Sequence, residues 1–433
     1  MNSCPDCSPR ASEKTNHEQA NTVSKPHIWI VSPASAKANN GNWQSAKRWA
    51  RFLRTRYRVT IAQQWPAPDG DAGEAKLAGA TGTATTGRAA AAGTTAPSTG
   101  DGAPDLLIAL HARRSAAALA AFRHTWPQRP TVLLLTGTDL YRDIQHDASA
   151  QAALRQASAL VVLQSDGLAH LPAPLRANAS VIYQSAATLR APAGAATSAA
   201  ATSAATAASA LATATAAAMA ATTMDAATTP GSATAAVTPP PAPRRRHLDI
   251  CMIGHLRAEK DPQTFMRAAA LVTAPAARLL HIGGALEPEL GRLARQTQAA
   301  TPRYHWLGAR PHGATRQRLK RSFLMALTSH MEGGANVIIE AVTCGVAVLA
   351  SDIGGNRGML GDDYAGYFAP GDAAALAGLI DRCIAEPAFH ARLRAQCAAR
   401  APLFAPAAER AALLKLVDNL LHSPPHTQQR NPT

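Results

Sequence analysis

Aromatic residues are scarce in this chain of 433 residues, where Phe, Trp and Tyr together make up 4%. A basic protein that binds nucleic acid needs aromatic side chains among its cations, or a helix that reads a groove, so this composition argues against a nucleic-acid partner. Long apolar runs are also missing. No stretch of about 20 strongly apolar residues occurs, and we expect no segment that spans a membrane.

Cysteine is used sparingly and without a metal-binding pattern. Of the 6 cysteines, only Cys4 and Cys7 form a Cys-x-x-Cys pair, and no second pair completes a metal site. The amino-terminal tail carries acids and lacks an apolar core, so it does not resemble a secretion signal. We therefore expect a reduced, cytoplasmic protein with incidental thiols.

Acidic residues are outnumbered by basic ones. The chain has 43 Lys and Arg against 28 Asp and Glu, which gives a formal net charge of +15. This balance favours anionic partners, and nucleic acid, anionic lipid and phosphorylated metabolites all carry the required charge. The length exceeds one ordinary core and predicts two domains.

Two segments have low complexity. Residues 67–103 are rich in Ala, Gly and Thr, and residues 187–243 are mostly Ala, Thr and Ser before a Pro-rich end. Neither has the large apolar side chains that offset the entropy of ordering, so both are interpreted as flexible insertions. The chain then divides into a tail (1–24), a first domain (25–186), a linker (187–246), a second domain (247–404), a carboxy-terminal helix (405–422) and a second tail (423–433).

Both domains contain short apolar runs typical of buried strands. These runs are HIWIVS, RVTIAQ, DLLIALH, TVLLLTG, ALVVLQ and SVIYQ in the first domain, and LDICMIG, RLLHIGG, YHWLG, FLMALTS and VAVLAS in the second. Helical patterns separate several of them. The alternation predicts an α/β fold in which helices cover both faces of parallel sheets. Two such domains imply a cleft between them, with ligands at the carboxyl ends of the strands.

The helices are predicted from apolar stripes. In residues 42–56 the stripe consists of Trp43, Ala46, Ala50 and Leu53. In the second domain, helices are expected to start near Asp261, Glu287, Gly313 and Ala335. The last helical pattern, at 405–421, is a candidate to pack back across the first domain.

The stretch GHLRAEKDP, residues 254–262, follows the first strand of the second domain. It places His255, Arg257 and Lys260 around a turn from strand to helix. Cations at this position, together with free N–H groups at the start of the next helix, suit a diphosphate. A solvated charged loop is the alternative interpretation.

The stretch MEGGANVIIEA, residues 331–341, is more specific. Gly333 and Gly334 allow close approach of a ligand to the backbone and leave amides free at the start of a helix. Glu332 precedes that helix and Glu340 lies about two turns along it, so the carboxylates are over about 10 Å apart and do not form an acid–base dyad. They suit hydroxyl groups at the two ends of a sugar nucleotide. Two exposed glutamates near a helix start are the alternative.

The first domain carries candidate groups for a small anion. Arg113 and Arg114 follow a strand directly after His111, and an arginine pair suits a phosphate-like dianion. His111 either bonds a backbone carbonyl or contacts the donor sugar. An asparagine-rich loop leads into the first helix and offers backbone amides for an anion. Thr138 and Asp139 follow the next strand, and Asp139 could instead cap the helix after it. The predicted acceptor-side residues are Asn39, Asn40, Gly41, Asn42, Arg113, Arg114, Thr138 and Asp139.

The second domain resembles the donor-binding half of GT-B glycosyltransferases, of the kind grouped in glycosyltransferase family 4. The resemblance rests on Glu332 and Glu340 in an E-x(7)-E pattern, on GHLRAEK, and on CGVAVLAS with the Gly-Gly that follows it. It implies two Rossmann-like, doubly wound parallel-sheet domains that face a cleft. It also implies that Glu332 contacts the transferred sugar, Glu340 the ribose and Lys260 the diphosphate, while backbone around YHWLG meets the base.

Two departures from the family pattern concern the same site. His255 stands where the family usually has arginine, so Arg257 is expected to supply the second cation. After Gly355 the usual glutamate is missing, and the sequence reads NRGMLG. The donor-binding residues implied by the resemblance are Gly254, His255, Arg257, Lys260, Leu307, Gly308, Glu332, Gly333, Gly334, Ala335, Asn336, Val337 and Glu340.

The first domain narrows the resemblance to the selenosugar synthases of selenoneine biosynthesis. SPASAKANNGNWQSAKRWARFL, LHARRSA and TGTDLY carry it, together with GHLRAEKDP, MEGGANV and GMLGDDYAGYF. It implies transfer of a sugar from UDP-glucose or UDP-N-acetylglucosamine to selenophosphate, with no further cofactor. It also implies a functional link to the enzymes that make selenophosphate and form selenoneine. The expected catalytic residues are Glu332, Lys260, Arg257 and His111.

No metal is expected at the site. Asp69 and Asp71 form an Asp-x-Asp pair, but it lies in a Gly- and Ala-rich insertion, where we interpret it as chance. Two other classes remain open. One is a transferase of the same fold that acts on a lipid or glycan, although the chain lacks an amphipathic helix with a strongly basic face. The other is a non-catalytic nucleotide-sugar sensor, which would not need Arg113 and Arg114.

Overall fold

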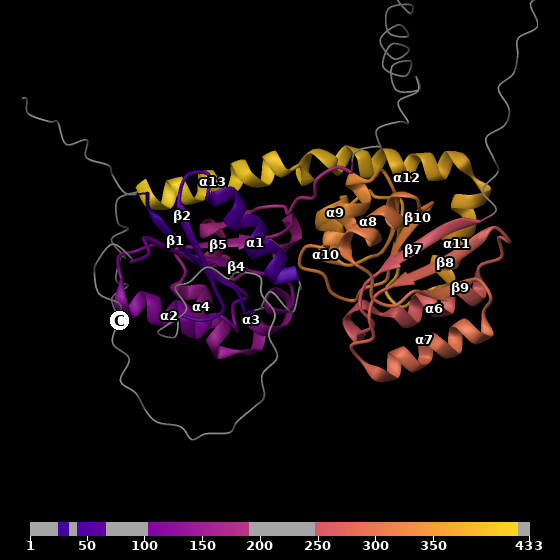
Figure 1. Ribbon diagram of the computed structural model, residues 1–433, viewed down its shortest axis with the longest axis horizontal. Helices are drawn as coiled ribbons and strands as arrows, with labels where there is room; N and C mark the ends of the chain where they lie inside the picture. The colour runs from indigo at the N-terminus through magenta and orange to yellow at the C-terminus, as the bar shows by residue number, and fades with distance from the viewer. Residues whose placement is uncertain (1–24, 34–40, 66–102, 190–246, 423–433) are drawn as a thin grey trace, which may run out of the picture.

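The computed structural model describes residues 25–33, 41–65, 103–189 and 247–422. Two α/β halves lie side by side, and the last helices run along one edge of both (Figure 1). The segments with low complexity fall almost entirely outside the described residues, as do Asn39, Asn40, Asp69 and Asp71.

The first half contains one parallel sheet of six strands in the order β2-β1-β3-β4-β5-β6. The strands are β1 (His27–Val31), β2 (Arg58–Ala62), β3 (Leu106–Leu110), β4 (Thr131–Leu134), β5 (Ala159–Val162) and β6 (Ala179–Val181). The helical elements are α1 (Gly41–Leu53), α2 (Ala116–Thr125), η2 (Asp139–Asp143), α3 (Ile144–His146), α4 (Ala148–Gln156), η3 (Ser165–Leu168) and η4 (Ala173–Asn178). Every residue of β3 is buried, which explains its unbroken apolar sequence LLIAL.

The second half contains another parallel sheet of six strands, in the order β12-β11-β10-β7-β8-β9. The strands are β7 (Leu248–Ile253), β8 (Ala277–Ile282), β9 (Tyr304–Trp306), β10 (Leu324–Leu327), β11 (Ala347–Ser351) and β12 (Tyr367–Phe368). The helical elements of this half are η5 (Ala258–Lys260), α6 (Pro262–Leu271), α7 (Pro288–Ala300), α8 (His312–Lys320), α9 (Asn336–Thr343), α10 (Gly354–Leu360), α11 (Ala373–Ala385), α12 (Pro387–Arg400) and η6 (Ala401–Phe404). The last helix of the chain is α13 (Pro406–His422).

The predicted α/β architecture with two parallel sheets is confirmed. Every strand expected from an apolar run is present, and the helices expected near Asp261, Glu287, Gly313 and Ala335 begin within one residue of those positions. The short strand β12 and the helices α10 to α12 were not predicted. The buried face of α1 is only partly as predicted. Trp43, which was placed on the apolar stripe, is half-buried, whereas Trp49, which was not, is fully buried.

The carboxy-terminal helix α13 joins the two halves. Leu413, Leu414 and Val417 pack in the same apolar cluster as Trp49 and Leu53 of α1. The chain therefore crosses back after the second half is complete, and α13 belongs to the core of the first half (Figure 1).

Candidate active site at the junction of the two halves

The loop after β7 is held in a defined shape by its own residues. Asp261 has a left-handed backbone with φ of 41°, and its side chain accepts from the Thr264 N–H at the start of α6. Gly283, at the end of β8, lies so close to this loop that a β-carbon there would overlap the carbonyl oxygen of Gly254. Strand ends and a helix cap thus fix the turn that carries Lys260.

Lys260 and Glu332 meet at the carboxyl edge of the second sheet. The Lys260 Nζ lies 2.5 Å from Oε1 of Glu332, whose side chain is only 8% exposed. The Ser329 hydroxyl donates to the same oxygen at 2.6 Å. Ser329 was not among the predicted site residues, although its position just after β10 and three residues before Glu332 was a usable signal. The site therefore combines a cation, a carboxylate and a hydroxyl group.

Glu340 lies further along α9 and has a partner that the sequence did not suggest. Nε2 of His312, the first residue of α8, lies 2.5 Å from Oε1 of Glu340. This hydrogen bond to the carboxylate raises the pKa of His312 above its usual value, against an opposing effect of partial burial. The pair is therefore an ion pair over more of the neutral pH range than an ordinary histidine would allow.

The other predicted residues of this half line the same edge with different contacts. His255 Nδ1 accepts from the Gly284 N–H at 3.1 Å. Arg257 is half-exposed beside Glu259, 3.9 Å away, and no described contact joins it to Lys260. Gly308 has φ of 66°, and its carbonyl oxygen accepts from the Gly283 N–H at 3.0 Å. The loop that contains Leu307 and Gly308 thus lies next to the turn after β7.

His111, on the face of the first half, is buried and has a constrained backbone. It is 3% exposed and has φ of 72°, a backbone conformation that few residues other than glycine adopt. Its Nε2 lies 3.3 Å from the Thr138 hydroxyl and 3.8 Å from Asp143. Burial lowers the pKa of His111, so the ring is neutral near pH 7 and suits a hydrogen-bonding role.

Asp139 lies in the interior rather than at a ligand site. Its side chain is fully buried and accepts from the N–H groups of Ala112, Thr136 and Gly137 at 2.9 Å each. The prediction that Asp139 contacts the acceptor is therefore corrected, because its carboxylate is used to order the loops that hold His111 and Thr138.

The arginine pair lies next to this cluster. Arg113 donates from Nε to Asp143 at 3.0 Å and is 42% exposed. The Arg114 backbone N–H faces His111 Nδ1 at 3.5 Å, and its side chain is exposed. Arg113 and Arg114 follow β3 as predicted. The guanidinium group of Arg113, however, is already paired with the carboxylate of Asp143.

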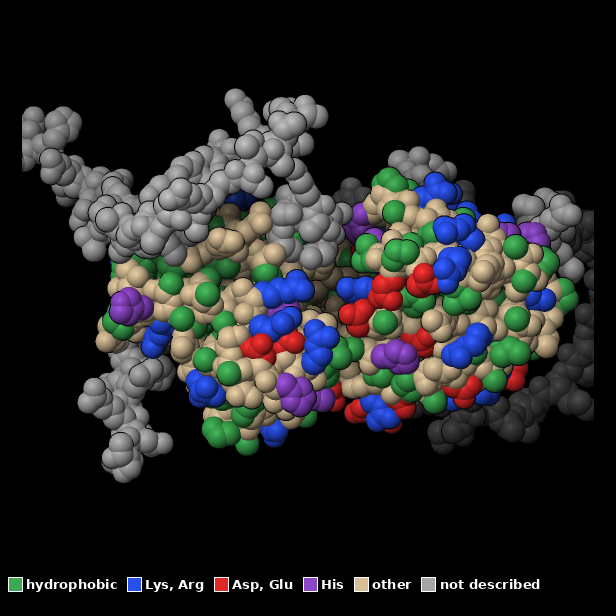
Figure 2. Space-filling view, turned by 90° about the horizontal axis from the view of Figure 1, so that it is seen from below, with side chains coloured by type: hydrophobic (Ala, Val, Ile, Leu, Met, Phe, Trp, Pro, Cys, Tyr) green, Lys and Arg blue, Asp and Glu red, His purple; other side chains and the backbone are tan. Residues whose placement is uncertain are grey.

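Close glycine contacts bring the two faces together. A β-carbon on Gly333 would lie 2.3 Å from the Thr136 carbonyl oxygen and 2.5 Å from Cα of Gly137, and one on Gly334 would lie 2.6 Å from Cβ of Leu163. The predicted reason for these glycines, close approach of a ligand, is therefore incomplete, because the first half fills the space beside them. On the face drawn in Figure 2, basic and acidic side chains gather at this junction, where the surface is hollowed.

The asparagine-rich loop also reaches the junction where it is described. A β-carbon on Gly41 would lie 3.9 Å from Nδ2 of Asn336. Gly41 and Asn42 begin α1, and Asn336 begins α9, with Ala335 as its cap and Val337 next to it. The amino-terminal ends of a helix from each half therefore lie near one another, which favours an anionic ligand between them.

The Gly333 contact leads to a prediction. We expect Gly333→Ala to loosen the junction and to lower the free energy of unfolding by about 1–3 kcal/mol, because an added methyl group meets backbone atoms that cannot rotate away. Urea denaturation and hydrogen–deuterium exchange of residues 131–140 measure the effect. The matched control is Gly378→Ala, at an exposed position of α11 with nothing within 4 Å of the added methyl group. Equal free energies of unfolding in the two variants would contradict the prediction.

The segment after Gly355 packs against the first half. Asn356 is fully buried and donates from Nδ2 to the Ser351 carbonyl oxygen at 2.8 Å. Two residues later, a β-carbon on Gly358 would overlap Oε1 of Gln164 from the first half. A side chain at Gly358 would therefore require Gln164 to move.

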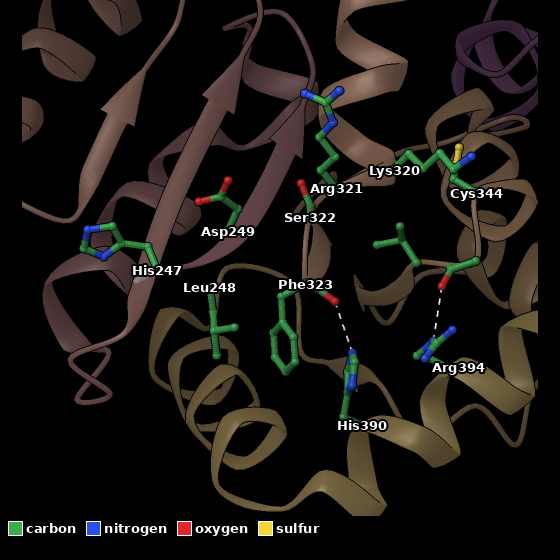
Figure 3. A pocket seen from close by; sticks show the side chains of 12 residues that line it. His247, Leu248, Asp249, Lys320, Arg321, Ser322, Phe323, Cys344, His390 and Arg394 are labelled. Atoms are coloured by element: carbon green, nitrogen blue, oxygen red, sulfur yellow. Dashed lines mark hydrogen bonds between the residues drawn. The ribbon is translucent and has the colours of Figure 1, made fainter. Parts of the chain in front are cut away.

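A cavity of about 350 Å³ lies at the opposite edge of the second sheet (Figure 3). Leu248, at the start of β7, and Phe323 line it, whereas Lys260 and Glu332 follow the other ends of the strands. Two of its basic side chains make protein contacts: His390 Nε2 bonds the Phe323 carbonyl oxygen, and Arg394 Nε bonds that of Gly345. Ligands of parallel α/β sheets bind at the carboxyl ends of strands, so this cavity is not the candidate active site.

Within the described ranges, no three His, Cys, Asp or Glu side chains are grouped so that they could hold a metal ion. No helix in the same ranges is long and apolar enough to cross a bilayer.

Comparison with known proteins finds similarity in the second half and a shared fold. Residues 241–403 match the model of the family described as glycosyl transferases group 1. No curated protein matches the chain. The second half is therefore similar to that family over the matched residues, and the described chain has the GT-B fold of two facing parallel-sheet domains.

Solved structures support that fold over most of the chain. HepE from Anabaena, in complex with UDP and glucose, has a TM-score of 0.60 at 15% identity and covers 91% of this chain and 100% of its own. Sucrose-phosphate synthase from Thermosynechococcus elongatus has a TM-score of 0.62 at 17% identity, with 92% and 99% covered. A glycosyltransferase from Rickettsia africae has a TM-score of 0.58 at 12% identity, with 92% and 100% covered.

Proposed function

We propose that the protein is a glycosyltransferase that takes its sugar from a UDP-sugar. The observation that carries this proposal is the contact of Lys260 with Glu332 at the carboxyl edge of a domain similar to group 1 glycosyl transferases, with Glu340 further along the following helix. The structure of HepE solved with UDP-glucose, which has the same fold, supports a donor of this type.

Each group then has a chemical task. The Lys260 ammonium group stabilises the charge that builds on the diphosphate leaving group, Glu332 accepts hydrogen bonds from the sugar, and Glu340 accepts them from the ribose. Arg257 supplies a second positive charge once a ligand draws its half-exposed side chain inward. A diphosphate between the amino-terminal ends of α1 and α9 also benefits from their backbone N–H groups.

For the acceptor we propose selenophosphate, so that the product of the transfer is a selenosugar whose selenium still carries the phosphoryl group. The bond from the anomeric carbon to the diphosphate oxygen breaks, a selenium lone pair forms the new bond to that carbon, and UDP leaves with the electron pair. An anionic selenium needs no general base, so this proposal gives His111 no role in removing a proton. The first-half motifs and the neighbouring arginine pair support this acceptor.

The experiment is anaerobic incubation of the protein with selenophosphate and either UDP-glucose or UDP-N-acetylglucosamine. Mass spectrometry follows the selenium isotope pattern on the sugar, and a coupled assay follows UDP release. A selenosugar that forms only with both substrates is the expected result. Binding of the UDP-sugar without a selenium product would retain the donor site but overturn the acceptor, and lipid or glycan acceptors would then be tested.

The arginine pair gives a prediction for the acceptor side. We expect the double variant Arg113→Ala, Arg114→Ala to raise the KM for selenophosphate about tenfold, because hydrogen bonds to a charged ligand are lost. The affinity for UDP should stay unchanged. Initial rates at saturating UDP-sugar measure KM, and calorimetry measures UDP binding. Loss of UDP affinity in the double variant would instead assign these arginines to the donor.

A further inference from the structure

His312 lies against the residue that we assign to the ribose. It opens α8, directly after Pro311, which caps the helix. Its side chain is 63% exposed, whereas the Glu340 side chain beside it is 12% exposed. A buried carboxylate therefore has one oxygen bonded to an imidazole that is open to solvent and to its protons.

The charges around the ring favour its protonated form. Glu340 faces it from α9 and raises its pKa through both the hydrogen bond and the negative charge, whereas Arg316, one turn further along α8, acts in the opposite direction. Arg316 is 8% exposed and donates from Nη2 to the Ala187 carbonyl oxygen, so its position is set by other contacts. The carboxylate has the larger effect of the two, so the pKa of His312 is raised and its protonated form is favoured.

The carboxylate has two oxygens with different tasks. Oε1 of Glu340 accepts from His312 at 2.5 Å, which fixes the rotation of the carboxylate and leaves Oε2 to accept from a ligand hydroxyl group. Without this bond, the side chain would lose its preferred orientation. A charge-assisted hydrogen bond is the type of contact that holds such a group in place.

We propose that His312 is a positioning residue of the donor site and that its proton couples UDP-sugar binding to pH. This inference rests on the proposed function of Glu340 as the ribose-binding residue. Because the pair raises the pKa of His312, the ion pair is present below that pKa and is lost as the pH rises through it. Donor affinity should therefore fall on the alkaline side, whereas kcat at saturating donor should change little.

The test compares His312→Ala and His312→Arg with the unchanged protein. Calorimetric titration with UDP at pH 6.5 and pH 8.5 gives Kd, and initial rates give KM and kcat. We expect His312→Ala to weaken UDP binding about fivefold at the lower pH, the size typical of an ion pair with one exposed partner, and to remove most of the pH dependence. His312→Arg keeps a cation and should retain tight binding at both pH values.

The controls separate the inference from the function on which it rests. His124→Gln, an exposed histidine in α2 of the first half, should leave both Kd and its pH dependence unchanged. If the unchanged protein binds no UDP, the proposed function fails. If Glu340→Ala weakens UDP binding but His312→Ala does not, or if His312→Ala tightens it, only the role of His312 is overturned.

Discussion

Replacing Lys260 with alanine is expected to lower kcat about 100- to 1,000-fold, the usual cost of removing one group that stabilises developing negative charge. The Lys260 side chain is 18% exposed and lies in the loop after β7, where a diphosphate leaving group would be held. Its positive charge stabilises the transition state, in which negative charge builds on the diphosphate, more than it stabilises the bound substrate. The KM for the UDP-sugar should therefore change much less than kcat.

The contact with Glu332 complicates this experiment and also supplies its control. Lys260→Ala leaves a nearly buried carboxylate with only the Ser329 hydroxyl as a described side-chain partner, so part of any loss could come from a displaced Glu332. A double-mutant cycle with Glu332→Ala separates the two effects, since residues that act as one unit show non-additive losses. Lys260→Arg, which keeps the charge, should recover part of the rate.

The measurement uses steady-state rates of UDP release, with thermal unfolding as a check on folding. Lys415→Ala, an exposed lysine on α13, is the matched control and should retain full activity. A Lys260→Ala variant that keeps its rate within about fivefold of the original would contradict the role, because that loss is below the cost of even one stabilising contact.

The sequence was informative where local chemistry determines structure. Apolar runs such as LLIAL define strands that are buried on both faces, and Asp261 before Pro262 predicts a helix start that the structure shows. Glu332 and Lys260 could be placed at one sheet edge for the same reason, since both follow strands of a parallel sheet.

Contacts between distant segments could not be predicted in the same way. Nothing near Gly333 in the sequence shows that Thr136 and Gly137 lie against it, since that proximity depends on how two separate sheets face each other. The pairing of His312 with Glu340 depends on the packing of α8 beside α9. Asp139 was assigned to the acceptor because its position after a strand is the same whether its carboxylate faces a cleft or the interior.

The second large effect is expected at Glu409, on α13. Its side chain is 1% exposed and accepts from Trp49 Nε1 at 2.9 Å, from Arg48 Nε at 2.8 Å and from the Ser185 hydroxyl at 2.5 Å. Glu409→Ala removes the shared acceptor of three donors and leaves an arginine without its carboxylate. We expect a loss of about 3–5 kcal/mol in the free energy of unfolding, as for other broken buried ion pairs.

The control for Glu409 is a glutamate in an exposed ion pair. Glu386 pairs with Arg382 at 3.0 Å, but both side chains are more than half exposed. Glu386→Ala should therefore cost less than about 1 kcal/mol. Urea denaturation of the two variants measures the difference, and equal midpoints would show that the Glu409 contacts contribute little.

The two halves should respond differently to the loss of Glu409. Its partners belong to α1 and to the segment after β6, and α13 packs in the apolar cluster of the first half, whereas the second half has a separate cluster around Phe265 and Ile339. Unfolding of Glu409→Ala should therefore split into two transitions, with the first half melting earlier. UDP should still raise the second transition, because Lys260, Glu332 and Glu340 lie in the half that remains folded. A single transition that UDP shifts as a whole would show that the halves unfold together.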